Sequence, residues 1–176
     1  MTTRGTLVLL AVLVVVGGWL ALELRPRPTA PAGAEPLLAT RPSVVATLEV
    51  TTSDRTLAAV RRGDDWADAD GRPWPATVVA DVVDTLTGLH ALMVVDSDPS
   101  DAAQYGLAPA TVTRVRLAAT DGSPLLDLEL GERNPAGTGV YVRRAGRPEV
   151  LLVGAILAWE LDKLLAAAPS RTTLDQ

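Results

Sequence analysis

The feature of this sequence that most restricts its fold is an Asp-Gly pair between two segments of matched pattern. Asp121-Gly122 separates residues 111–120 from residues 123–130, and such a pair between strands is typical of a two-residue β-hairpin turn. Pairing through this turn places charged residues opposite charged residues on one face and apolar residues opposite apolar residues on the other. The predicted partners are Arg116 with Asp127, Arg114 with Glu129, Val115 with Leu128, and Leu117 with Leu126. A shift of one residue would destroy both patterns, so the sequence predicts this register, with exposed charged pairs and buried apolar pairs.

The rest of the chain from residue 44 alternates between strand and helix patterns. Strands are expected at residues 44–50, 56–61, 90–95, 140–144 and 149–153, most of them joined by turn-forming residues into hairpins. Pro75 precedes a wide apolar stripe at helical spacing, which is made by Val78, Val79, Val82, Val83, Leu86 and Leu89. A second stripe, ended by Pro169, is made by Ile156, Leu157, Leu161, Leu164 and Leu165. The sequence therefore predicts an α+β fold in which two amphipathic helices lie on one face of an antiparallel, hairpin-rich sheet.

Residues 7–22, LVLLAVLVVVGGWLAL, form an unbroken apolar run near the start of the chain. With Gly5 and Thr6, the run approaches the length of a helix that crosses a hydrocarbon core of about 30 Å. Trp19 lies near one end, where interfacial indoles are common. A cleaved signal peptide is the alternative, but the residues after the run make a poor cleavage site. We therefore expect residues 1–24 to form one transmembrane anchor.

Proline marks the segment that follows this run. Residues 25–43 contain five prolines, and proline fixes φ and lacks an N–H donor, so we expect a semi-extended linker. Residues 44–176 are then long enough for one compact domain. Arg4 before the anchor and Arg25 and Arg27 after it leave the positive-inside rule nearly neutral. The short tail before the anchor favours a single-pass protein of the cytoplasmic (inner) membrane with an extracytoplasmic C-terminal domain.

The composition excludes several classes of chemistry. The chain has no cysteine, which removes disulfides, thiolate nucleophiles and zinc–thiolate sites. Its single histidine, His90, rules out a multi-histidine metal site and is the one residue around which a Ser-His-Asp triad could form. From residue 28 onward the chain carries 13 basic and 20 acidic residues, and phosphate backbones repel an acidic domain. The sequence therefore predicts no nucleic-acid partner, no cofactor, no metal and no catalytic residues.

Two acidic segments bear a partial likeness to calcium loops. Aspartates at positions 64, 65, 68 and 70 precede Gly71, but aligning this glycine with that of a calcium loop places Trp66 and Thr77 where carboxylates are required. We interpret Asp64, Asp65, Asp68 and Asp70 as a solvated turn. Asp96, Asp98 and Asp101 are interpreted in the same way, as a polar loop that can cap a helical turn before Tyr105.

Two further segments are weighed as anion sites. Residues 131–139, GERNPAGTG, lack the Lys-Ser/Thr ending of a phosphate loop and are not followed by a helix. They are interpreted as a connection between strands that needs a positive φ angle. Arg143, Arg144 and Arg147 could bind an anion, but such a cluster is more typical of the polar face of a hairpin. His90 lies after a helix and before a strand with no second catalytic partner in any motif, so we interpret it as structural.

Several short motifs follow one another in order along the domain. They are Trp66 followed by Pro75, the stripe from Val78 to Leu89, Tyr105-Gly106-Leu107-Ala108-Pro109, Leu130-Gly131, Asn134-Pro135, Gly139-Val140-Tyr141-Val142-Arg143 and Val150-Leu151-Leu152-Val153. With these motifs, residues 44–171 resemble a bacterial family known as domain of unknown function 4340, whose Tyr-Gly-Leu-x-x-Pro element is one residue shorter here. The N-terminal anchor is similar to that family as well.

The resemblance implies an anchored extracytoplasmic domain that is often encoded beside ABC-type transporters of the gliding-associated kind, and it implies no catalytic residues. Many members look longer, with the unit repeated, whereas this chain holds one unit. The expected function is therefore that of an accessory or interaction subunit, which is not an enzyme and which binds proteins of an ABC-type transporter or related membrane complex. The alternative is an exported module that binds a polymer or glycan.

Overall fold

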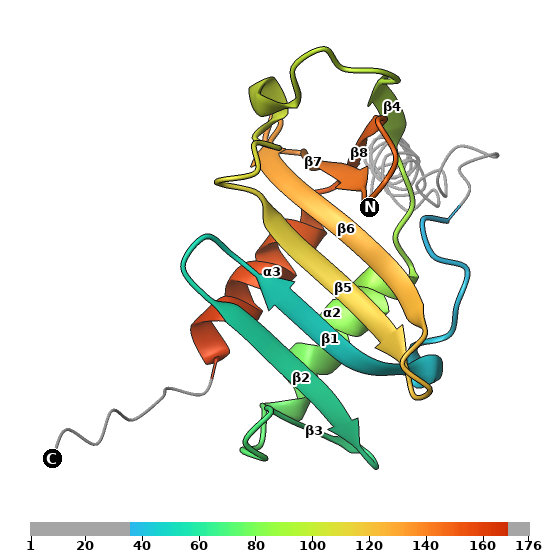
Figure 1. The fold of residues 1–176 in the computed structure, drawn as a ribbon, viewed down its shortest axis with the longest axis vertical. Helices are drawn as coiled ribbons and strands as arrows, with labels where there is room; N and C mark the ends of the chain where they lie inside the picture. Colours follow the sequence, from blue (N-terminus) through green and yellow to red (C-terminus); the bar gives the residue numbers. More distant parts are fainter. Residues whose placement is uncertain (1–35, 169–176) are drawn as a thin grey trace, which may run out of the picture. The chain divides into compact units, whose positions relative to one another are not determined.

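The computed structural model of the protein describes residues 36–168. Eight strands form one antiparallel sheet in the order β3-β2-β1-β5-β6-β7-β8-β4, and helices α2 and α3 lie together behind it in Figure 1. In chain order the elements are η1 (Pro42–Val44), β1 (Val45–Thr51), β2 (Thr56–Arg62), β3 (Asp65–Ala67), α2 (Ala76–Thr87), β4 (Met93–Asp96), η2 (Ala102–Tyr105), β5 (Thr113–Ala119), β6 (Pro124–Arg133), β7 (Gly139–Arg144), β8 (Val150–Gly154) and α3 (Ile156–Ala167). The predicted α+β fold is confirmed.

The predicted hairpin forms between β5 and β6 in the expected register. Arg116 is opposite Asp127, and Leu117 is opposite Leu126. The apolar residues that alternate with these charges are buried, with Val115 and Leu128 fully inaccessible to solvent. The register is confirmed as far as Leu117, because this pairing keeps the apolar side chains of both strands on the same, covered face. The predicted two-residue turn is wrong: after Leu117 the register shifts by one residue, so that Ala118 pairs with Pro124, and the Gly122 N–H donates a hydrogen bond to the Ala119 carbonyl at 2.9 Å.

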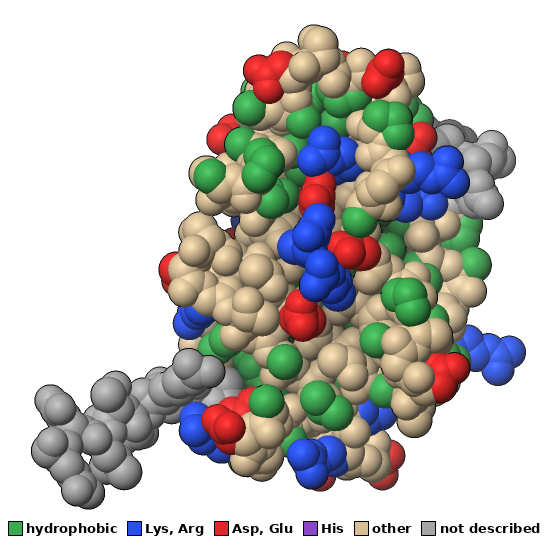
Figure 2. All heavy atoms as spheres, in the orientation of Figure 1, with side chains coloured by type: hydrophobic (Ala, Val, Ile, Leu, Met, Phe, Trp, Pro, Cys, Tyr) green, Lys and Arg blue, Asp and Glu red, His purple; other side chains and the backbone are tan. Residues whose placement is uncertain are grey.

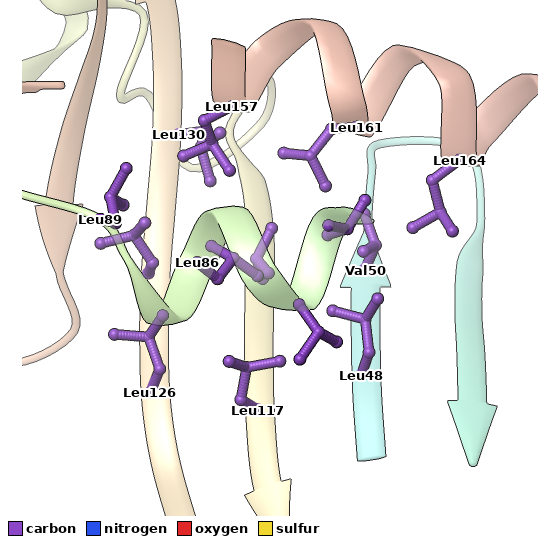
Figure 3. Packing of buried hydrophobic residues seen from close by; sticks show 14 of the residues in the cluster. Leu48, Val50, Leu86, Leu89, Leu117, Leu126, Leu130, Leu157, Leu161 and Leu164 are labelled. Carbon is purple, nitrogen blue, oxygen red and sulfur yellow. The ribbon is translucent and has the colours of Figure 1, made fainter. Parts of the chain in front are cut away.

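The hydrophobic core lies between this face of the sheet and the two helices. Helix α2 buries four residues of its predicted apolar stripe, which are Val79, Val82, Val83 and Leu86. Helix α3 buries Leu157, Leu161 and Leu164, and Figure 3 shows these side chains facing leucines of α2, β1, β5 and β6. The prediction that Ile156 belongs to the α3 stripe is wrong, because this residue opens the helix with 52% of its surface exposed.

The chain joins the folded domain earlier than residue 44. Leu37 and Leu38 are buried in the core cluster, and the Leu37 N–H donates a hydrogen bond to the Leu89 carbonyl at 2.9 Å. Arg61 Nη2 donates a hydrogen bond to the Pro42 carbonyl at 3.2 Å. Residues 36–43 therefore belong to the domain and not to the expected linker, because burial of the two leucine side chains favours their attachment to the core.

The expected anchor at residues 1–24 lies outside the described part of the chain, as do linker residues 25–35. Between residues 36 and 168, no helix is both long and apolar enough to cross a membrane.

Candidate functional site

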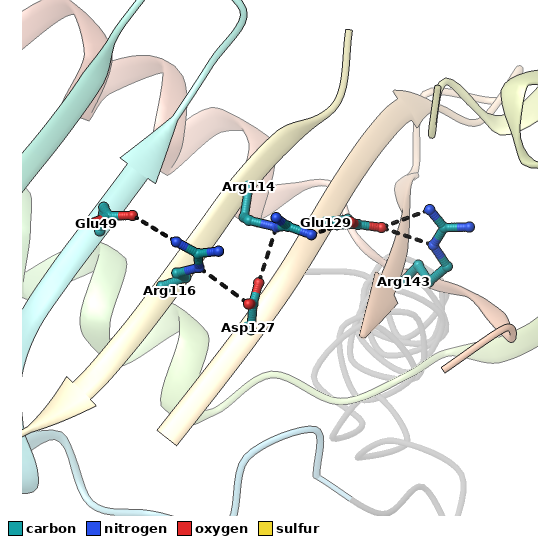
Figure 4. Close-up of polar contacts among 6 residues, drawn as sticks. All are labelled: Glu49, Arg114, Arg116, Asp127, Glu129 and Arg143. Carbon is teal, nitrogen blue, oxygen red and sulfur yellow. Dashed lines mark hydrogen bonds and ion pairs between the residues drawn. The ribbon is translucent and has the colours of Figure 1, made fainter. Parts of the chain in front are cut away.

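Six charged side chains form a ladder across four strands, on the face of the sheet opposite the helices. They are Glu49 of β1, Arg114 and Arg116 of β5, Asp127 and Glu129 of β6, and Arg143 of β7 (Figure 4). Arg116 lies at the β1 side, with Nη1 3.2 Å from Glu49 Oε1 and Nε 3.2 Å from Asp127 Oδ2. Its hydrogen bond to Asp127 raises the pKa of the Arg116 guanidinium above its ordinary value. Figure 2 shows the resulting stripe of mixed charge across the middle of this face.

Glu129 lies at the other end of the ladder between two arginines. Its Oε1 is 2.6 Å from Arg114 Nη2, and its Oε2 is 2.7 Å from Arg143 Nη2. The prediction that the Arg114–Glu129 pair is exposed is wrong for Glu129, because this residue is only 9% exposed. The reason is Arg143, which reaches over from β7 and encloses the carboxylate from the second side. Because three acidic and three basic residues compensate one another, the ladder leaves no excess positive charge with which to bind a free anion.

The acidic turn predicted at residues 64–70 is held by an arginine. Asp68 accepts a hydrogen bond from the Arg72 N–H at 2.8 Å, and Asp70 Oδ2 lies 3.0 Å from Arg72 Nη2. Asp64 is exposed in the turn from β2 to β3, and Asp65 is exposed as the first residue of β3. The interpretation as a solvated turn therefore describes this segment. Among residues 36–168, no group of three or more acidic or histidine side chains lies in a position to hold a metal ion.

The segment weighed as a phosphate loop connects β6 to β7. Asn134 Oδ1 accepts hydrogen bonds from the N–H groups of Thr138 and Gly139, at 2.9 and 3.1 Å. Gly137 has a φ angle of 69°, a conformation that side-chain-bearing residues rarely adopt. The interpretation as a strand connection with positive φ is confirmed.

The remaining predicted residues do not converge on one site. His90 Nδ1 lies 2.7 Å from the Gly88 carbonyl oxygen, close to its own place in the chain. Arg143 belongs to the ladder, whereas Arg144 lies 3.8 Å from Glu149 and so serves the β7–β8 hairpin. These contacts support a structural role for the histidine and for both arginines.

A groove of about 540 Å³ lies beside Arg55 and Arg72. Trp74 forms part of its wall but is 5% exposed, and its Nε1 donates a hydrogen bond to the Ala58 carbonyl at 3.0 Å. The indole therefore offers no open ring face on which a sugar could stack.

A feature that sequence reasoning missed is an apolar sheet edge at β4. Leu92, Met93 and Val94 are 45%, 56% and 55% exposed, and β4 is the last strand on its side of the sheet. A run of three exposed large apolar residues on an edge strand is unusual, since native sheets protect their edges with charge, proline or covering segments. The signal present in the sequence was the apolar run at residues 91–95 followed at once by an acidic loop.

The model of the family described as "Domain of unknown function (DUF4340)" matches residues 73–174, which include both helices and strands β4 to β8. The chain belongs to this family. No curated protein and no solved structure matches it. The DUF4340 match starts after β3, so it covers less of the N-terminal part than the resemblance over residues 44–171 implied.

The Tyr105-Gly106-Leu107 and Leu130-Gly131 motifs of this DUF4340 domain meet in space. A Cβ atom added at Gly131 would lie 2.1 Å from the Tyr105 carbonyl oxygen and 3.1 Å from Leu107 Cγ. Tyr105 in turn packs edge-on against Tyr141 with ring centroids 5.2 Å apart, and its hydroxyl donates to Asp96 at 3.1 Å. The absence of a side chain at position 131 thus lets the segment after β4 lie directly on β6, which fixes the acidic loop beside the β4 edge.

Proposed function

We propose that this protein is an accessory subunit of a membrane complex and binds a partner protein through its C-terminal domain. The observation that carries the proposal is the exposed apolar edge at β4. Soluble proteins rarely expose contiguous large apolar residues unless these residues bind a partner. The ladder of compensated charges and the residues expected to be structural offer no nucleophile paired with a base. A binding role therefore has more support than a catalytic one.

The apolar run at residues 7–22 supports attachment to a membrane, and in this proposal the membrane is the cytoplasmic (inner) one, with the domain on the extracytoplasmic side. In this proposal the anchor holds the domain beside its partner, and the partner is a subunit of an ABC-type transporter or a related complex. Because residues 36–43 pack on the domain, the linker that sets its distance from the anchor is confined to residues 25–35. The length of this linker affects binding only if the partner also lies at the membrane.

The alternative, an exported module for a polymer or glycan, has less support. The groove of about 540 Å³ lies within the usual size of ligand sites, but its arginines already pair with neighbouring aspartates. A glycan site would need an open aromatic platform and unpaired polar groups, and Trp74 supplies neither.

Purification of the full-length protein from its own membranes in mild detergent tests the proposal. We expect a second protein species to co-purify in a fixed ratio. Deletion of residues 28–35 shortens the linker by about 25 Å in polyproline form, so it should reduce co-purification while the domain still unfolds at the same temperature. Recovery of the full-length protein alone, under conditions that keep other membrane complexes intact, would contradict the proposal.

A further inference from the structure

The backbone on the outer side of β4 has no partner in the described part of the chain. On the inner side, Met93 and Val94 pair with β8, and the Leu92 N–H donates to the Leu152 carbonyl at 2.8 Å. Consecutive residues of a strand direct their N–H and C=O groups to opposite sides, so those of Met93 face the open side. This edge can accept another strand.

The opposite edge of the sheet and the backbone just before β4 are each paired with another segment of the chain. At the opposite edge, Pro73 bridges to Ala67 of β3, and the Trp74 N–H donates to the Trp66 carbonyl at 2.8 Å. Before β4, Pro36 forms an antiparallel bridge with His90. The open stretch is therefore short and begins just after His90.

Three carboxylates lie where the open stretch ends. Asp96, Asp98 and Asp101 form no ion pair with any basic residue among residues 36–168. Asp96 accepts from the Tyr105 hydroxyl, and Asp101 accepts from the Ala103 N–H as the cap of η2. Their negative charges therefore lie beside the apolar edge without a basic side chain to balance them. They would attract basic side chains of another protein.

We propose that β4 receives an extended apolar segment of the partner protein as an added antiparallel strand, with one or more Lys or Arg residues just before that segment. Antiparallel addition places the N-terminal end of the incoming strand beside Asp96, so its basic residues meet the carboxylates. Backbone hydrogen bonds with Met93 supply affinity, and contacts with Leu92 and Val94 supply selectivity for apolar side chains. This inference rests on the proposed function and names the surface and the chemistry of the partner.

Two other occupants fit these observations less well. A second copy paired antiparallel through β4 would bring each acidic loop to the end of the edge that Pro36 already closes. An anionic lipid surface would be repelled by the unpaired carboxylates. Both are outcomes that the experiment below separates from the proposal.

Binding of synthetic peptides to the full-length protein in detergent micelles tests the proposal. The first peptide has two lysines followed by alternating valine and threonine, and the second has the same residues with the lysines at the C-terminal end. We expect the first to bind about tenfold more tightly, with a preference that fades as salt rises. Substitution of both Asp98→Asn and Asp101→Asn keeps the hydrogen-bonding geometry and should remove most of that preference.

The double variant Met93→Ala with Val94→Ala should weaken the first peptide by at least about tenfold, whereas Trp159→Ala removes a side chain of similar exposure (53%) away from the edge and should not. Equal binding of the two peptides, or binding unaffected by the alanine pair, would overturn the inference. So would a dimer of the full-length chain that the alanine pair dissociates, or tighter binding to phosphatidylglycerol vesicles than to neutral ones. If a natural partner co-purifies equally with the wild type and the alanine pair, this inference fails while the proposed function stands.

Discussion

Substitution of Gly131→Ala should destabilise the protein even though it replaces glycine within a strand. In an unobstructed strand the added methyl group would stabilise the fold by about 0.5–1 kcal/mol, because alanine loses less backbone entropy than glycine. Here the new Cβ would lie 2.1 Å from the Tyr105 carbonyl oxygen, whereas carbon and oxygen normally approach to about 3.3 Å. The Tyr105–Leu107 segment must therefore move away from β6 by about 1 Å.

The magnitude follows from the contacts that this movement breaks. The edge-on packing of Tyr105 on Tyr141 contributes about 0.5–1.5 kcal/mol, and the hydrogen bond from Tyr105 to Asp96 contributes a similar amount. Leu107 is 1% exposed, and its complete burial contributes about 1.5–3 kcal/mol, of which part is lost. We expect Gly131→Ala to reduce the free energy of unfolding by about 2–4 kcal/mol.

Urea unfolding of the full-length protein in mild detergent, followed by tryptophan fluorescence, measures this loss. Gly137→Ala is the control, because Gly137 has positive φ but open space around it, so its cost of about 1–2 kcal/mol is purely conformational. Combined with Leu107→Ala, the Gly131 variant should be non-additive by about 1 kcal/mol, whereas the Gly137 variant should be additive within about 0.5 kcal/mol. A Gly131→Ala protein as stable as the wild type would refute this account of the two motifs.

Three further predictions follow from the sheet and its ladder. Leu128→Ala should cost about 2–5 kcal/mol in urea unfolding, because Leu128 is fully buried in the core; a loss below about 1 kcal/mol would contradict its place there. Glu129→Gln should cost about 1–3 kcal/mol, less than for a fully buried pair because Arg114 and Arg143 retain partial solvation, and the loss should shrink at high salt. Burial, and then the hydrogen bond to a carboxylate, raise the pKa of Tyr105 above its usual value of about 10. Because the pKa is raised, the stability that the protonated Tyr105 hydroxyl contributes is complete at neutral pH and is lost as the pH rises through the Tyr105 pKa. The difference between the ultraviolet titrations of the wild type and of Tyr105→Phe gives the pKa of Tyr105. A midpoint below the usual value of a tyrosine would contradict the prediction.

The parts of the fold that could be predicted are those whose signal is local and repeated. The β5–β6 register followed from charge and apolarity alternating together around Asp121-Gly122. The α2 stripe followed from valines and leucines at helical spacing. In both segments, local propensity and the burial pattern agree, and such agreement allows the secondary structure to be predicted without knowledge of the tertiary contacts.

The features that could not be predicted depend on partners that are distant in the sequence. Glu129 is buried because Arg143 of the next strand encloses it, and pairing within one hairpin gives no sign of that neighbour. Strand β3 has only three residues, which is too short to show an alternating pattern in the sequence. It is held in the sheet by its pairing with β2 and by the bridge between Ala67 and Pro73. The β4 strand was expected, but its position at the sheet edge follows from strand order, which the sequence does not encode locally.

Site-specific photo-crosslinking in intact membranes tests most directly the central claim that the β4 edge binds a partner protein. A photo-reactive side chain is introduced at Met93 and, in a separate full-length variant, at Trp159; the two positions are 56% and 53% exposed. The account predicts that illumination joins position 93 to one discrete protein of a different sequence, and that position 159 gives little or none of that product. Equal products from both positions, or no product from position 93 in membranes that contain the native complex, would contradict it.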